Sequence, residues 1–248
     1  MENIVGEKNF NPETNEGNKI ELDAFELSEL EYNEAITKDQ RTFFRTYKDI
    51  LSREHIIIFT FLICDDYNIS YIKYVRFIFL LATDMVLNVF FFSDESMHKI
   101  FLNYGKYNFV QQIPQIVYTT IVTQLMEVFI CFLSMTDKYI YDIKRLGHPW
   151  NKNEMLKILR CIKIKLDFLF AFTFIFFLVY WYIISAFCAV YENTQIIYLK
   201  DCLSSFLLGV LTPFFIYLFP TSLRIFSLRY SKKNLKCIYK LSDIIPFF

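Results

Sequence analysis

Four long apolar stretches, separated by polar connections, dominate the pattern of hydrophobic positions along the chain. A helix crosses the hydrocarbon core of a bilayer, about 30 Å thick, with about 20 apolar residues at 1.5 Å each. Each stretch has about that length, so the pattern predicts membrane-spanning helices at residues 74–92, 113–133, 166–190 and 202–223. The predicted fold class is an all-α, polytopic integral membrane bundle.

A fifth apolar run, HIIIFTFLIC at residues 55–64, is about half as long as a span. It predicts a short re-entrant or interfacial helix, or an element that lies against the bundle. The basic residues that precede it share a side with the other basic segments only if the run does not cross. We therefore favour four spans, while the depth of residues 55–64 stays open.

Lysine and arginine are unevenly distributed among the connections, and positively charged loops tend to stay in the cytosol. The connection between the second and third spans carries eight of them, and the segment after the fourth span carries six. The two remaining connections, 93–112 and 191–201, carry two and one. This bias predicts that both termini are cytosolic, in a plasma membrane or an endomembrane.

The ends of the chain differ in charge from its middle. Residues 1–40 hold eleven acids against three lysines, which predicts an acidic, largely disordered cytosolic tail, at least as far as Lys19. Residues 41–230 form the predicted helical membrane domain, and residues 231–248 a basic cytosolic tail. The six cysteines include no CxxC pair and are expected to be apolar fillers. Cys188 and Cys202 flank one short loop, so a disulfide between them is an alternative if that loop faces an oxidising compartment.

Polar residues inside two predicted spans form one helical face each. Asp84 and Asn88 lie on the first span, and the second carries Thr120, Thr123, Gln124 and Glu127. A carboxylate in hydrocarbon must be protonated, paired or in contact with water, and no lysine or arginine is expected at the depth of Asp84 or Glu127. The stripe is either an ion or proton path, or a set of interhelical hydrogen bonds worth about 1 kcal/mol each.

Two further patterns have both a functional and a structural interpretation. In the fourth span, Ser205 and Gly209 allow another helix to approach, and Pro213 predicts a kink, which serves either gating or structure alone. Just before the third span, basic residues either bind anionic lipid headgroups or only set the topology. These residues are Lys157, Arg160, Lys163 and Lys165.

The connection after the first span contains SDESMHK, in which Ser93 and Asp94 favour a helix start, Gly105 a stop, and Pro114 the opening of the second span. Asp94 and His98 are too few for a metal site. The nucleotide-binding, kinase, hydrolase and metalloprotease motifs are missing from the sequence. We therefore expect no enzyme, no cofactor, no metal and no nucleic-acid partner.

Several segments carry a resemblance to a known family. They include DDYN at 65–68, FFSDESMHK at 91–99 and CAVYENTQ at 188–195. Over about residues 27–229 the chain resembles a family of uncharacterised multi-pass transmembrane proteins of ciliates and related protists. The resemblance implies a membrane domain in which the run at 55–64 is a regular element. It implies no activity, ligand or catalytic residue.

The function expected from these patterns is that of a non-enzymatic membrane module. It would sit in the lipid bilayer and anchor or assemble with other membrane proteins or with copies of itself. The alternative is a channel or transporter that conducts cations or protons by way of Asp84 and Glu127.

Overall fold

A computed structural model describes residues 22–62, 67–104, 106, 108–145, 152–230 and 235–244. Within them, 87% of residues are helical and none lies in a strand. Residues 1–21 of the acidic tail, the end of the short apolar run, Gly105, and residues 231–234 and 245–248 of the basic tail lie outside the described residues.

Four helices are long and apolar enough to cross a membrane, which confirms the predicted number. They are α5 (Ser70–Phe91), α7 (Phe109–Ser134), α9 (Lys152–Val190) and α10 (Gln195–Ile216). All four begin before the predicted bounds because a helix continues through polar residues that hydropathy does not detect. The 39 residues of α9 extend about 58 Å, nearly twice the hydrocarbon thickness.

The prediction that Pro114 opens the second span was wrong, because α7 begins five residues earlier and Pro114 lies inside it. Proline deprives the carbonyl four residues before it of a donor, and the second turn of a helix tolerates this loss better than its middle does. The expected helix start after the first span is confirmed: α6 (Asp94–Leu102) is capped by Ser93, whose hydroxyl accepts from the Ser96 N–H (3.2 Å).

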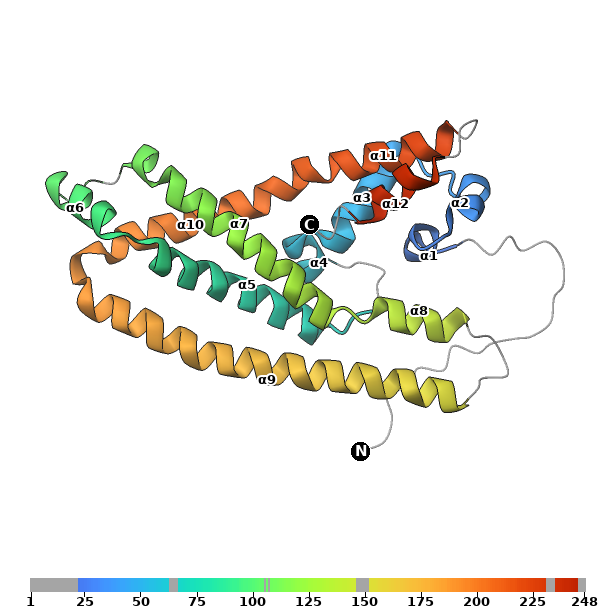
Figure 1. Ribbon diagram of the computed structural model, residues 1–248, viewed down its shortest axis with the longest axis horizontal. Coiled ribbons are helices and arrows are strands. Elements are labelled where there is room, and N and C mark those ends of the chain that lie inside the picture. Colours follow the sequence, from blue (N-terminus) through green and yellow to red (C-terminus); the bar gives the residue numbers. More distant parts are fainter. Residues whose placement is uncertain are drawn as a thin grey trace.

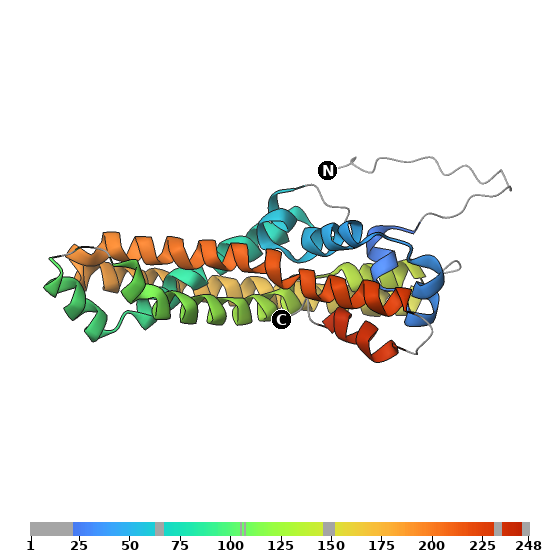
Figure 2. The ribbon, with the colours of Figure 1, turned by 90° about the horizontal axis from the view of Figure 1, so that it is seen from above.

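The long helices run along the same axis and leave shorter elements at both ends (Figures 1 and 2). α6 and the turn between α9 and α10, which contains the 3₁₀ helix Glu192–Thr194, lie at one end. α1 (Ala24–Ser28), α2 (Tyr32–Lys38) and α8 (Asp137–Arg145) lie at the other, which we call the basic end. α5 and α7 pack against each other, and each also packs against α9 and α10, so these two helices form the centre of the bundle.

In its described part, the short apolar run forms α4 (Ile56–Phe61), six residues that extend about 9 Å. α3 (Phe43–Glu54) precedes it, and the chain bends at His55, whose ring caps α4 by accepting from the Ile58 N–H (3.5 Å). α4 packs on α5, and α3 packs on α11 (Leu218–Arg229). Among the expected alternatives, the structure has an element that lies against the bundle.

Both predicted tails contain helices in their described parts, whereas the acidic segment was expected to be largely disordered. α1 and α2 lie within the acidic segment, and α12 (Lys236–Ile244) lies within the basic one. Leu30, Tyr32 and Ala35 form a buried cluster with Tyr239 of α12. The high net charge of the acidic segment gave no indication of these apolar positions. Their packing holds α2 and α12 against α11.

Candidate functional site

A buried polar cluster links three of the long helices. The Asn88 amide of α5 donates to Ser205 Oγ of α10 (2.8 Å), and the Ser205 hydroxyl donates to Asp84 Oδ2 (2.9 Å). From α7, Thr120 donates to the Ser205 carbonyl (3.3 Å) and Thr119 to Asn88 Oδ1 (3.5 Å). The Asp84 carboxylate is therefore held by hydrogen bonds from neighbouring side chains.

Glu127 lies apart from this cluster and forms an ion pair with Arg76 of α5, whose Nη2 is 2.9 Å from Glu127 Oε1. The prediction that no basic residue lies at its depth was wrong. α5 starts at Ser70, so Arg76 is about 9 Å from the helix end, and Glu127 is about 10 Å from the end of α7 at Ser134. The two helices are antiparallel neighbours, which brings the two side chains to one level.

The predicted stripe on α7 thus divides into two parts. Thr120 joins the Asp84 cluster, whereas Gln124 and Glu127 line a cavity. Thr123 lies between them on the helix, and its buried hydroxyl has no hydrogen-bond partner in the described structure. Ser205 was expected only as a small residue; the structure makes it the link between α10 and Asp84.

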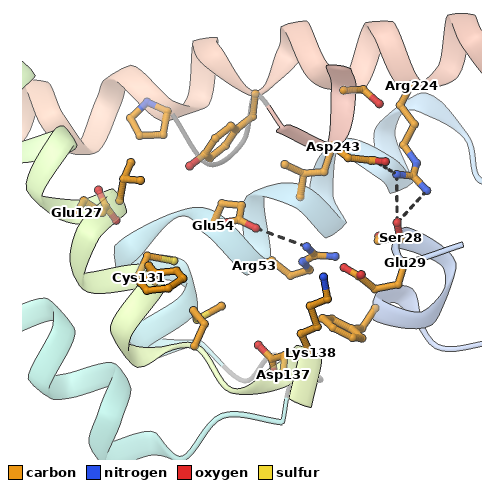
Figure 3. A pocket seen from close by; sticks show the side chains of 18 of the residues that line it. Ser28, Glu29, Arg53, Glu54, Glu127, Cys131, Asp137, Lys138, Arg224 and Asp243 are labelled. Atoms are coloured by element: carbon orange, nitrogen blue, oxygen red, sulfur yellow. Dashed lines mark hydrogen bonds and ion pairs between the residues drawn. The ribbon is translucent and has the colours of Figure 1, made fainter. Parts of the chain in front are cut away.

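The cavity has a volume of about 880 Å³ and lies where the long helices meet the short helices of the basic end (Figure 3). Its inner wall contains Glu54 of α3, Arg76 and Glu127, and its outer wall contains Arg224 and Asp243. Figure 3 shows side chains from α1, α3, α7, α8 and α11 that converge on the same space. No sequence pattern predicted this cavity, because its walls come from segments across the whole chain.

Ion pairs line much of the cavity. Arg53 is 3.5 Å from Glu54, whose side chain is 7% exposed, and Arg224 is 2.8 Å from Asp243. Burial raises the pKa of Asp243 to about 6, although the nearby charge of Arg224 opposes this shift. The outer wall therefore carries a carboxylate that changes charge in mildly acidic solution.

Arg224 also belongs to a charge cluster, which we call the clamp and define as Asp39, Arg41, Arg224 and Asp243. The first three are buried, and the Asp243 side chain is 39% exposed. Asp39 Oδ2 accepts from Arg41 (2.7 Å) and Arg224 (3.2 Å). Burial alone would raise the pKa of Asp39, but the hydrogen bonds and positive charges of the two arginines outweigh burial and lower it. The clamp joins the segment after α2 to α11 and α12, over the outer wall of the cavity.

The region around Pro213 forms a break between two helices. α10 ends at Ile216 and α11 begins at Leu218. Two carbonyls near the proline receive side chains from the α3–α4 segment: Tyr47 donates to the Phe214 carbonyl (2.9 Å), and His55 Nε2 is 2.9 Å from the Val210 carbonyl. A Cβ at Gly209 would lie 3.8 Å from Thr120 of α7, so α7 is the helix that approaches this small residue.

The four candidate lipid-binding cations do not share one face. Lys157, Arg160 and Lys163 are exposed on α9, whereas Lys165 lines the cavity and donates to the Met135 carbonyl (2.7 Å). Cys188 and Cys202 are both free thiols. Where the structure describes the chain, no group of three or more potential metal ligands occurs.

Comparisons of the chain with protein-family models, curated proteins and solved structures found no match. The fold itself defines the class: this is a helical protein with four helices long and apolar enough to cross a membrane. The resemblance to the protist family stays a prediction.

Proposed function

We propose that the chain is a non-enzymatic, multi-pass membrane protein that anchors or assembles with other membrane proteins or with copies of itself. Its basic end would face the cytosol and hold both termini. The observation that carries the proposal is the outward surface of α9, because only 11% of the apolar window of this helix is buried within the fold.

Large side chains form a stripe on that surface. Phe174, Leu178 and Trp181 are 67%, 59% and 64% exposed, and their spacing of four and three residues places them on one helical face. In a bilayer such a face contacts acyl chains or the helices of a partner. The buried carboxylates support the same proposal, because Asp84 and Glu127 are bonded within the chain and so contribute to the bundle itself.

Site-specific photo-crosslinking in the native membrane tests this proposal. A photoreactive residue at Leu178 should give discrete protein adducts, whereas one at Leu169, which is 0% exposed on the same helix, should give none. If Phe174, Leu178 and Trp181 all gave only lipid adducts while the protein remained folded, α9 would not be an assembly surface.

A cation or proton path is the second candidate, because the cavity extends toward the polar residues of the long helices. The cavity reaches from the basic end to Gln124 and Glu127, and the buried Thr123 hydroxyl follows on the side of the Asp84 cluster. An ion or proton path from the cavity past Thr123 would have Asp84 as its most deeply placed ionisable group.

Flux into liposomes that contain the purified chain separates the two candidates. The variants are Asp84→Asn and the double variant Arg76→Gln with Glu127→Gln, which removes both charges so that neither is left unpaired. Flux through the wild type that disappears in a helical Asp84→Asn variant would establish conduction. Wild-type liposomes without flux would remove this candidate.

A further inference from the structure

Two buried polar atoms on the cavity wall have no partner. Arg76 and Thr46 are 2% and 1% exposed and line the cavity, yet Arg76 Nε and Thr46 Oγ1 have no hydrogen-bond partner in the described part of the chain. Buried polar groups are nearly always satisfied, and an unsatisfied one destabilises the fold. These atoms indicate that something outside the described chain completes the cavity.

The chemistry of Arg76 defines what is missing. A guanidinium only donates hydrogen bonds, so the absent partner must be an acceptor. Nη2 already donates to Glu127 (2.9 Å), while Nη1 contacts only the sulfur of Met135 (3.8 Å). The guanidinium therefore retains donors for a second oxygen group, and its planar fork suits phosphate or carboxylate.

Two lysines of the lining have no carboxylate partner. Lys165 donates to the Met135 carbonyl and lies over the rings of Phe132 and Tyr139 (5.4 and 5.0 Å). Lys138 is exposed at the wall and has no ion pair with the residues described. Two acids of the lining, Glu29 and Asp142, also lack an ion pair of this kind, and both are exposed, as Lys138 is.

The remaining acids of the lining already form ion pairs or hydrogen bonds within the chain. Glu54, Glu127 and Asp243 pair with arginines, and Asp137 accepts from the Tyr67 N–H (2.8 Å) and from the Asn68 amide. The inner cavity consequently offers unused donors and no unused acid, which favours an anionic ligand over a cationic one.

The position and walls of the cavity favour an amphiphile over a small soluble ion. The volume of about 880 Å³ suits a molecule much larger than phosphate. Apolar side chains share the wall with the cations, among them Ile50, Val128 and Ile216. Phe132, also in the wall, is 73% exposed at the end of α7, where the headgroup layer of a bilayer would begin.

We propose that this cavity binds the phosphate headgroup of an anionic phospholipid from the adjoining leaflet. The Arg76 guanidinium would contact its oxygens, Lys165 and Lys138 would neutralise its charge, and the apolar wall would hold the start of its acyl chains. The proposal goes beyond the assembly function and does not depend on it.

Native mass spectrometry of the full chain in detergent tests this site. The probes are dioctanoyl phosphatidic acid, dioctanoyl phosphatidylcholine and inorganic phosphate. We expect the anionic lipid to bind more tightly than phosphatidylcholine, and Lys138→Gln with Lys165→Gln to weaken it by roughly tenfold, since each lysine makes a charge-assisted contact. The matched control, Lys236→Gln with Lys240→Gln, removes two exposed lysines of α12 that do not line the cavity and should leave binding unchanged.

Each outcome decides the question. Equal weakening by both double variants would overturn the site, because it would indicate surface attraction alone. Binding of inorganic phosphate with the same variant dependence, but no binding of the lipid, would replace the lipid with a soluble phosphate compound. If the double variant melts earlier than the wild type, the exposed single variant Lys138→Gln should still weaken binding by roughly threefold; an unchanged affinity would count against the proposal.

Discussion

Asp84 and Glu127 are carboxylates within long apolar helices, yet they are satisfied in different ways. Asp84 accepts from the Ser205 hydroxyl and the Asn88 amide, whereas Glu127 pairs with a full positive charge on Arg76. Neutral donors allow a carboxyl group to be protonated without leaving another charge unpaired. Protonation of Glu127 would leave the Arg76 charge unpaired, because loss of one charged member leaves the other buried and charged.

We therefore expect Glu127→Gln to destabilise the protein by about 3 kcal/mol, the lower end of the range for breaking a buried pair, since the Glu127 side chain is 24% exposed. The double variant Arg76→Gln with Glu127→Gln should recover most of this loss. Denaturation in detergent measures both. Glu95→Gln is the control: it breaks the exposed pair with Lys99 and should leave stability unchanged. A double variant as unstable as the single would refute a charge-based cause.

At the scale of elements, α10 is positioned by close contact with α7 on one side and by the α3–α4 segment on the other. Gly209 faces Thr120 of α7, and the Val210 and Phe214 carbonyls receive His55 and Tyr47. These contacts surround Pro213, where the helix cannot form its own complete ladder. The break between α10 and α11 is therefore supported by side chains from a distant part of the chain.

The space beside Gly209 predicts that stability depends on the size of the side chain placed there. A Cβ there would be in ordinary contact with Thr120, at 3.8 Å, so Gly209→Ala should be neutral or stabilise by up to about 1 kcal/mol through helix propensity. Gly209→Leu should separate α10 from α7, break the bond from Thr120 to Ser205, and lower the melting temperature. Thermal unfolding in detergent checks both, and a destabilising Gly209→Ala would contradict the measured space.

At the scale of the whole molecule, the clamp joins the segment after α2 to α11 and α12 beside the cavity. Its two acids respond to pH in opposite directions. The pKa of Asp39 is lowered, so the stability it contributes is lost as pH falls below its ordinary range. The pKa of Asp243 is raised to about 6, so the folded state holds its proton more tightly than the unfolded state, and stability is lost as pH rises toward 6.

The docking of α1, α2 and α12 should therefore be most stable near pH 4, where the Asp39 contribution is still present and the Asp243 contribution has not yet been lost; both limits are about the ordinary pKa of aspartate. Hydrogen exchange of α1 and α2, normalised to the intrinsic rate at each pH, measures this docking. Asp243→Asn should remove the loss between about pH 4 and 6, and Asp39→Asn should weaken docking above about pH 4, where the Asp39 carboxylate contributes. A flat profile in the wild type would show that neither carboxylate controls the clamp.

The sequence alone determined the number of long apolar helices, the helix start at Ser93 and the short length of the run at 55–64, because hydrophobic length and capping are local properties. Only the tertiary structure decided that Arg76 contacts Glu127, that Ser205 contacts Asp84, and that residues of α1 and α12 line one cavity. These contacts depend on the rotation and relative height of neighbouring helices, and on apolar residues scattered among charges. No stretch of sequence contains that information by itself, since each contact joins residues dozens of positions apart or more.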